Sequence, residues 1–492
     1  MSEPILIAAA ITVAAPLLAA AAIVLGVGRG RLRRLAVVAA GVALASSLAM
    51  SFMWSRTDGA PLVFGDKLGG GSFFFVDGIT AVLLPYVALV EVSILLVAPR
   101  RALDAAAVAW FLAGAAATFT LFLTSHPLVM VALWIATAFV TWVSVRSTPG
   151  GRPAARTFAI AMTVAVVCMA VGTVLLVVDP PWAMAGGWMG TSGGWLVAVA
   201  VMIRKGIFPF HSWYPALFAG APMSTALAAT MPQVAAYTAV RLLIGHVDHP
   251  EGVAAELVVL AQLALVTAAY GAALAIVQRD LRSLIGTLAM SQSAMVLAGL
   301  AGTLAMELDG AFCVWVASGL SLTGIGLVTW ALESRAGSIR LDAPQGRFWD
   351  APVLAAFFLL FGLAGIGLPG TLSFVADDLI ISGTLDDHIH AGLLVIAATV
   401  LGGIAVMRGW FHVFGGPVAG DGPQHAILPR ERVALTALLA TLVLLGVWPD
   451  PLVRALDRAA GRLLGVAARE PVHDVRAAPD PADGLQDSPH GS

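Results

Sequence analysis

Charged side chains are scarce in this sequence: Asp, Glu, Lys and Arg make up 11% of its 492 residues, and 59% of the residues are hydrophobic. A soluble globular chain carries roughly 25% charged residues, so most of this surface must face something other than water. In lipid every backbone polar group needs an internal partner, which leaves a helical bundle or a closed barrel. The apolar runs are about 20 residues long and do not alternate, which predicts an all-α integral membrane protein.

Motifs for soluble ligands are also missing. No basic stripe is present, so we expect no nucleic-acid partner. The two cysteines, Cys168 and Cys313, lie in separate apolar runs without metal spacing, and we interpret them as small buried hydrophobic residues. The sequence has no phosphate loop, CxxC or HExxH motif and no stretch outside the apolar runs long enough for a catalytic domain. We therefore expect no cofactor, no metal and no redox active site in this chain.

About fourteen apolar runs are long enough to cross a bilayer. The first lacks a basic leader and a cleavage site, so it is predicted to be a retained helix, and the twelfth is predicted to continue through a break to about residue 385. The runs lie at about 5–27, 36–54, 78–98, 105–124, 127–145, 157–178, 193–216, 222–244, 253–277, 283–304, 310–333, 350–375, 388–411 and 430–448.

Arginine is distributed unequally between the loops. Seventeen arginines follow odd-numbered runs, whereas the opposite loops hold only Arg56 and Lys67. Because cytoplasmic loops carry the excess of Lys and Arg, both termini are predicted to be non-cytoplasmic, in a cell (inner) membrane. Beyond the last run, residues 451–468 predict a short interfacial helix, and 470–492 are rich in Asp, Pro and Gly and predict disorder.

Lys205 is the clearest charged residue inside a run. It lies about ten residues past the start of the seventh run, on the order of 15 Å deep. Gly206 and Pro209 follow and weaken the helix. A lysine beside a helix break is typical of a transport site. The alternative is that Lys205 forms an ion pair with a carboxylate and has a structural role only.

The twelfth run has the same design with the opposite charge. A Gly-Leu-Pro-Gly break at 367–370 precedes Asp377 and Asp378. Two adjacent carboxylates cannot both ionise cheaply in low dielectric, so at least one is expected to hold a proton and to exchange it. Asp378 alternatively lies at the outer interface.

Three further polar residues are candidates for a proton pathway. Glu91 is a third buried acid, and an ion pair to a neighbouring helix would explain it equally well. His211 could relay a proton or cap a loop. Gln233 could hold water or bridge helices, which is the commoner use of such residues.

The segment KGIFPFHSWYPALFAGAPMSTALAATMPQVAAYTAVR at 205–241 resembles the signature of the proton-conducting membrane transporter family. That family includes the antiporter-like subunits of respiratory complex I, multisubunit sodium/proton antiporter subunits and the membrane partner of inorganic-carbon pumps. VDG at 76–78, DLRSLIGTLAMSQ at 280–292 and LPGTLSFVADDLII at 368–381 also match. The matching residues of the first segment are Lys205, Pro209, His211, Trp213, Pro215, Ala221, Pro222, Tyr237 and Arg241.

The resemblance implies two inverted five-helix repeats with broken helices in the seventh and twelfth spans. The implied division is a three-helix region at 1–104, the first repeat at 105–245 and the second at 246–411. A last span at 412–448 follows, and then an interfacial helix and tail at 449–492.

The resemblance also implies a line of charged residues across the membrane midplane. Lys205 matches the lysine that the family carries in the seventh span. Asp377 matches the acidic residue that some members carry in the twelfth span. The chain departs from the line at three places: the fifth-span Glu falls at Ile135, the eighth-span base at Gln233 and the eleventh-span base near Leu322.

The leading hypothesis is a proton-translocating membrane subunit of an NADH:quinone oxidoreductase-like complex, working through Lys205 and Asp377. Its partners would be other membrane subunits and also quinone-reducing or carbonic-anhydrase-like peripheral subunits. The transported ions would be protons or sodium. Two alternatives stay open: a cation/proton antiporter or inorganic-carbon pump subunit without redox chemistry, and a non-conducting scaffold.

Overall fold

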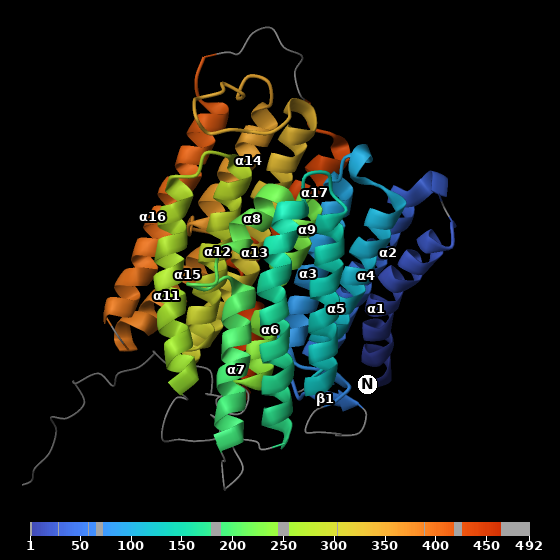
Figure 1. The fold of residues 1–492 in the computed structure, drawn as a ribbon, viewed down its shortest axis with the longest axis vertical. Coiled ribbons are helices and arrows are strands. Elements are labelled where there is room, and N and C mark those ends of the chain that lie inside the picture. The colour runs from blue at the N-terminus through green and yellow to red at the C-terminus, as the bar shows by residue number, and fades with distance from the viewer. Residues whose placement is uncertain are drawn as a thin grey trace, which may run out of the picture.

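A computed structural model describes residues 2–27, 29–57, 59–64, 72–178, 188–244, 255–302, 304–387, 389–417 and 426–463. The helices run roughly along one direction, with α1 and α2 at one edge of the bundle and α16 at the other (Figure 1). The α-helices are α1 (Ser2–Val24), α2 (Leu32–Ser55), α3 (Gly78–Val97), α4 (Ala105–Phe122), α5 (Pro127–Arg146), α6 (Arg152–Val178), α7 (Trp188–Lys205), α8 (Trp213–Gly220), α9 (Met223–Thr230), α10 (Val234–Leu242), α11 (Ala255–Ile276), α12 (Leu281–Leu300), α13 (Ala305–Ala336), α14 (Pro352–Gly365), α15 (Leu372–Asp387), α16 (Ile389–Phe414), α17 (Pro429–Val447) and α18 (Asp450–Leu463). Short 3-10 helices occupy Arg29–Arg31 and Arg100–Ala102.

The expectation of an all-helical membrane protein is confirmed. Within the described residues, ten helices are long and apolar enough to cross a membrane, or up to eleven if α17 and α18, which bend by 77° at their junction, count as one. Helix length therefore supports fewer spans than the expected fourteen, because the seventh, eighth and twelfth runs are each cut into two shorter helices. The break inside the eighth run was not expected. Helix α18 confirms the start of the expected C-terminal helix; its remainder and the predicted disordered tail lie outside the described residues.

Helix α13 lies at the centre of the bundle. Its most apolar stretch is entirely buried, whereas α2, α5, α6 and α16 bury only 33% of theirs. These four helices therefore lie at the outside of the bundle, and α13, α12 and α3 form its interior.

Helices α7 and α14 end in the same way. After α7, Gly206 has φ +70° and donates to the carbonyl of Ile203, while Ile207 donates to the carbonyl of Met202. After α14, Gly367 has φ +83° and Leu368 donates to the carbonyl of Leu363. Both ends are Schellman caps, which use a left-handed glycine to satisfy carbonyls that the helix leaves free. The two breaks expected from the sequence are thus formed by the same type of helix cap.

One face of the bundle carries the arginine-rich loops. Arg33 donates to the carbonyl of Ala98 at 2.6 Å, and Arg101 donates to the carbonyl of Ser334. These contacts join the start of α2, the segment after α3 and the end of α13, which the sequence assigns to one side. The same face holds two ion pairs, Arg282–Glu333 at 2.7 Å and Arg335–Glu431 at 2.6 Å.

The opposite face begins with a small antiparallel hairpin of β1 (Leu62–Phe64) and β2 (Phe74–Val76). The amide of Phe75 donates to the carbonyl of Leu123 at 2.8 Å, so the hairpin is tied to the end of α4. In Figure 1 β1 lies at the bottom of the bundle, away from the arginine-rich loops.

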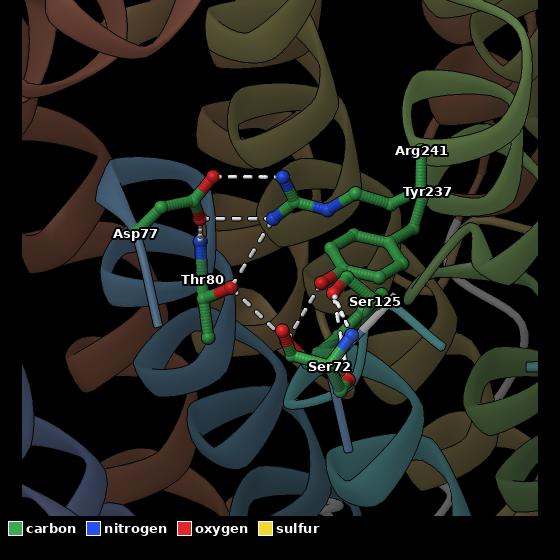
Figure 2. A network of polar contacts seen from close by, with 7 residues as sticks. Ser72, Asp77, Thr80, Ser125, Tyr237 and Arg241 are labelled. Carbon is green, nitrogen blue, oxygen red and sulfur yellow. Dashed lines mark hydrogen bonds and ion pairs between the residues drawn. The ribbon is translucent and has the colours of Figure 1, made fainter. Parts of the chain in front are cut away.

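A buried ion pair joins α3 to α10 near this face (Figure 2). Asp77 caps α3 by accepting from the Thr80 amide at 2.9 Å. Arg241 donates to both carboxylate oxygens of Asp77, at 2.7 and 2.9 Å, and its guanidinium lies 4.8 Å from the rings of Phe75 and Tyr237. Bidentate, charge-assisted contacts of this kind fix geometry as well as add energy.

Replacing Arg241 by Gln should destabilise the protein strongly, because it leaves the Asp77 carboxylate buried without a cation; the cost is about 3–5 kcal/mol. Thermal unfolding in detergent measures the effect. The control is Arg340→Gln, which breaks the exposed pair with Asp342 and should leave the midpoint almost unchanged. Equal midpoints for the two variants would contradict a structural role for the buried pair.

Candidate functional site

Lys205 is the last residue of α7 and is only 2% exposed. Its ammonium donates to the Oε1 atom of Gln233. In the part of the chain that the structure describes, no carboxylate lies within 4.0 Å of the Lys205 or Arg204 nitrogens. The sequence candidates Lys205 and Gln233 are therefore brought together, with an amide in place of a counter-ion.

The backbone of Gln233 is what places this amide. Gln233 lies between α9 and α10 with φ 51° and ψ 49°, the left-handed region that a residue with a side chain rarely adopts. Such strain persists only where the surroundings impose it, and it concentrates at functional sites. The break in the eighth run thus turns the Gln233 side chain onto Lys205.

Arg204 is a second cation at this depth, and sequence reasoning missed it. It donates to the Trp134 carbonyl at 2.8 Å and to the Thr137 hydroxyl at 2.7 Å, and its guanidinium lies 4.4 Å from the Trp134 ring centroid. The signal was available, since Arg204 precedes Lys205 in the same apolar run. Ile135, where the resemblance places a carboxylate, is 41% exposed, so α5 offers Arg204 a carbonyl and an aromatic ring.

A cavity of about 750 Å³ lies between α3, α4, α5 and α9. Its lining includes Arg101, Arg282 and Glu333 of the arginine-rich face, and also Thr225 and Arg204. The cavity thus extends from that face to Arg204 in the interior.

A second cavity of about 20 Å³ surrounds Lys205 and Gln233. Both cavities are lined by Thr141, Arg204, Ala229 and Val234. Arg204 therefore stands between the larger cavity and Lys205.

Glu91 lines the larger cavity and does not line the small one. It is 2% exposed, and its Oε2 atom has no hydrogen-bond partner within the described chain. A buried carboxylate oxygen without a protein partner is typically hydrated or protonated. Glu91 thus shares a cavity with Arg204 rather than a contact with Lys205.

His211 lies apart from this group. Its Nε2 atom is 3.4 Å from the Tyr270 hydroxyl, and its ring stacks on Phe208. His211 lines neither cavity.

In the second half, Asp377 lies beside the break that ends α14. A Cβ atom at Gly367 would lie 2.8 Å from its Oδ2 atom, so the glycine makes room for the carboxylate. Asp378, on the next position of α15, is exposed. The structure therefore separates the two acids: Asp377 faces the break and Asp378 faces outward.

Residues 170–403 match the family described as NADH:quinone oxidoreductase/Mrp antiporter, transmembrane. These residues belong to that family. The matched segment includes Lys205, Arg204, Gln233 and Asp377, and it ends within α16.

Curated relatives are similar over a comparable stretch. NADH-quinone oxidoreductase subunit M of Pseudomonas aeruginosa is 31% identical over 277 residues, which is 54% of this chain and 52% of the relative. Subunit M of Mycobacterium tuberculosis is 28% identical over 296 residues, 59% of this chain and 53% of the relative. The chain thus spans about half the length of the relatives it matches, and like them it is a multi-pass membrane protein.

Solved structures share the fold over nearly the whole chain. A chain of respiratory complex I from Thermus thermophilus with bound NADH superposes with a TM-score of 0.81 at 22% identity, covering 93% of this chain and 100% of that one. A chain of the Mrp complex from Dietzia has a TM-score of 0.81 at 19% identity, covering 93% and 98%. At these identities the likeness shows the fold.

If the larger cavity opens to the arginine-rich face, a cysteine at Thr225 should react with a water-soluble maleimide added from that side. The background is the double variant Cys168→Ala/Cys313→Ala, and the control is Thr238→Cys, which is fully buried on α10. Thr225→Cys should react on the order of tenfold faster, because a buried thiol is inert. Equal rates, or faster reaction from the opposite side, would contradict the opening.

Proposed function

We propose that this chain is a proton-translocating, antiporter-like membrane subunit of a complex I-like NADH:quinone oxidoreductase. The observation that carries the proposal is Lys205, a buried cation bound to a neutral amide at a helix break, behind a cavity that begins at the arginine-rich face. An intramembrane charge without a counter-ion is costly and rare, and it is typical of an ion pathway.

The proposed architecture has fourteen spans. The helix pairs α7 and α8, α9 and α10, and α14 and α15 would each cross once, and α17 would supply the last span. The proposed inverted repeats are 105–245 and 246–411, preceded by the three-helix region 1–104 and followed by 412–448 and 449–492. The matching Schellman caps at Gly206 and Gly367, one in each proposed repeat, support this symmetry.

The Lys205–Gln233 contact suits a group that changes charge. An amide oxygen accepts from an ammonium, and after rotation the amide nitrogen donates to a neutral amine, so Gln233 can remain bonded in both states. A carboxylate there would favour the charged lysine instead. In this proposal protons enter through the larger cavity, pass Glu91 and Arg204 and reach Lys205, while Asp377 exchanges protons in the second half. The driving reaction would take place in partner subunits, quinone-reducing ones in a complex I-like assembly.

Two other functions have support. The family match includes Mrp antiporters, which favours a cation/proton antiporter subunit, moving sodium or protons; an inorganic-carbon pump subunit with a carbonic-anhydrase-like partner is the related possibility. The outward-facing Ile135, in place of a carboxylate, favours a non-conducting scaffold. We place the chain in the cell (inner) membrane with both termini on the non-cytoplasmic side.

Reporter fusions test this orientation. A fusion at Gly150, in a loop rich in arginine, should report the cytoplasm, and a fusion at Gly59, between α2 and β1, should report the opposite compartment. If both fusions report the same compartment, the topology is wrong.

Asp377→Asn preserves shape and removes a titrating group. In the reconstituted complex it should abolish proton translocation or reduce it at least about tenfold, on the order of the loss seen when a proton-transfer group is removed. Asp378→Asn is the matched control, because its side chain is exposed, and should do much less. Assembly is checked by copurification of partner subunits. Wild-type translocation in both Asp377→Asn and Lys205→Met would leave the scaffold function.

A further inference from the structure

Helix α13 begins with a buried acid that the proposed pathway does not use. Asp309 is 7% exposed, and its Oδ1 atom makes no hydrogen bond within the described chain. It lies near the start of α13, whereas Ser334 near the end of α13 contacts Arg101 of the arginine-rich face. Asp309 therefore lies toward the opposite face.

Asp309 lies next to the helix that carries Asp377. At the following residue, Gly310, a Cβ atom would lie 2.6 Å from the Ile380 side chain and 2.9 Å from its amide, so α13 and α15 touch here. Asp377 precedes Ile380 by three residues and shares its side of α15. One helical turn, about 5 Å along the axis, separates the level of Asp377 from this contact.

Helix α18 packs against both α13 and α3 at this end of the bundle. Leu452, Leu456 and Ala459 are buried against the bundle, and the carbonyl of Ala455 lies 2.5 Å from where a Cβ atom of Gly78 would be. Asp457 projects from α18 and is close enough to act electrostatically on Asp309. The helices that carry Asp309 and Asp457 thus pack together, and of the two acids Asp309 is buried.

No described basic side chain forms an ion pair with either acid. On α18, Arg454 pairs with Asp450 and Arg458 is exposed. On α3, Asp77 is paired with Arg241, and Glu91 lies toward the arginine-rich face. The other charged or titratable side chains described on these helices are Asp377 and Asp378 on α15, Glu307 and Cys313 on α13, Tyr86 on α3, and, toward the arginine-rich face, Glu333 and Arg335 on α13 and Arg430, Glu431 and Arg432 on α17. Two neighbouring carboxylates without a cation are stable in low dielectric when they share a proton.

We propose that Asp309 and Asp457 form the opening of the second half of the pathway on the face opposite the arginine-rich one. The inference rests on the proposed function. A proton leaves the Asp377 carboxyl, binds the Asp309 carboxylate and then passes through Asp457 to the aqueous phase, so each acid gains and loses one proton in turn. Helix α18 thereby supplies part of the pathway, in addition to covering the bundle.

Carbodiimide labelling tests the shared proton without a transport assay. Dicyclohexylcarbodiimide adds to protonated carboxyl groups in apolar surroundings, and mass spectrometry of the full chain in native membranes locates the adduct. Asp309 should be labelled at neutral pH. The labelled fraction should fall several-fold in Asp457→Asn, recover in Asp457→Glu, and stay unchanged in Asp450→Asn, an exposed acid on the same helix. Absence of the adduct at Asp309, or equal labelling in all four proteins, overturns the inference.

Transport separates this inference from the proposed function. Asp309→Asn in the reconstituted complex should lose translocation as Asp377→Asn does, and Asp309→Glu should restore part of it. Unchanged translocation in Asp309→Asn, with loss in Asp377→Asn, overturns the opening and leaves the proposed function standing. Unchanged translocation in both Asn variants overturns the proposed function and the opening with it.

Discussion

The constraint on which this structure depends is that a helix cannot stop inside a membrane with its last carbonyls unpaired. Both α7 and α14 stop there, and each meets the constraint with a left-handed glycine whose neighbours return hydrogen bonds to the preceding turn. The breaks in turn create the sites. Lys205 is the last residue before one glycine, and Asp377 lies against the other. If α14 continued without a break, there would be no room at Gly367 for the Asp377 carboxylate. If α7 continued, Lys205 would lie in the middle of a helix and not at the helix end that meets Gln233.

Most of the fold was predictable because hydrophobic length and arginine placement are averages over many residues. The helical class, the breaks after Lys205 and before Asp377, and the grouping of the arginine loops on one face all follow from such patterns. The second break in the eighth run was not predictable, because it depends on the left-handed backbone of Gln233, a single residue whose strain is maintained by its surroundings. This break, like the two predicted ones, leaves helices that are each shorter than a full span.

The site was predicted only in part, because contacts between side chains depend on how the broken helices pack. Lys205 and Gln233 could be named from their depth, yet their contact depends on how two broken helices meet. Glu91 was expected to lie on a proton pathway or in an ion pair to a neighbouring helix, and the structure places it on the wall of the cavity that Arg204 also lines. Arg204 directly precedes Lys205, but consecutive residues on a helix point about 100° apart and reach different surroundings, so the neighbours of one do not predict those of the other. His211 matched a motif and still lies elsewhere, packed on Phe208 and Tyr270.

The length and burial of α13 have a mechanical consequence. Its 32 residues form one unbroken helix, with Asp309 near one face and Glu333 and Arg335 near the other. Along the way its glycines take close neighbours from both halves of the chain: Leu227 and Met223 at Gly326, Phe361 at Gly324 and Ile380 at Gly310. Close-packed interiors have little slack and transmit strain. A displacement of the Arg282–Glu333 pair would therefore be transmitted along α13 toward Asp309 at the opposite face.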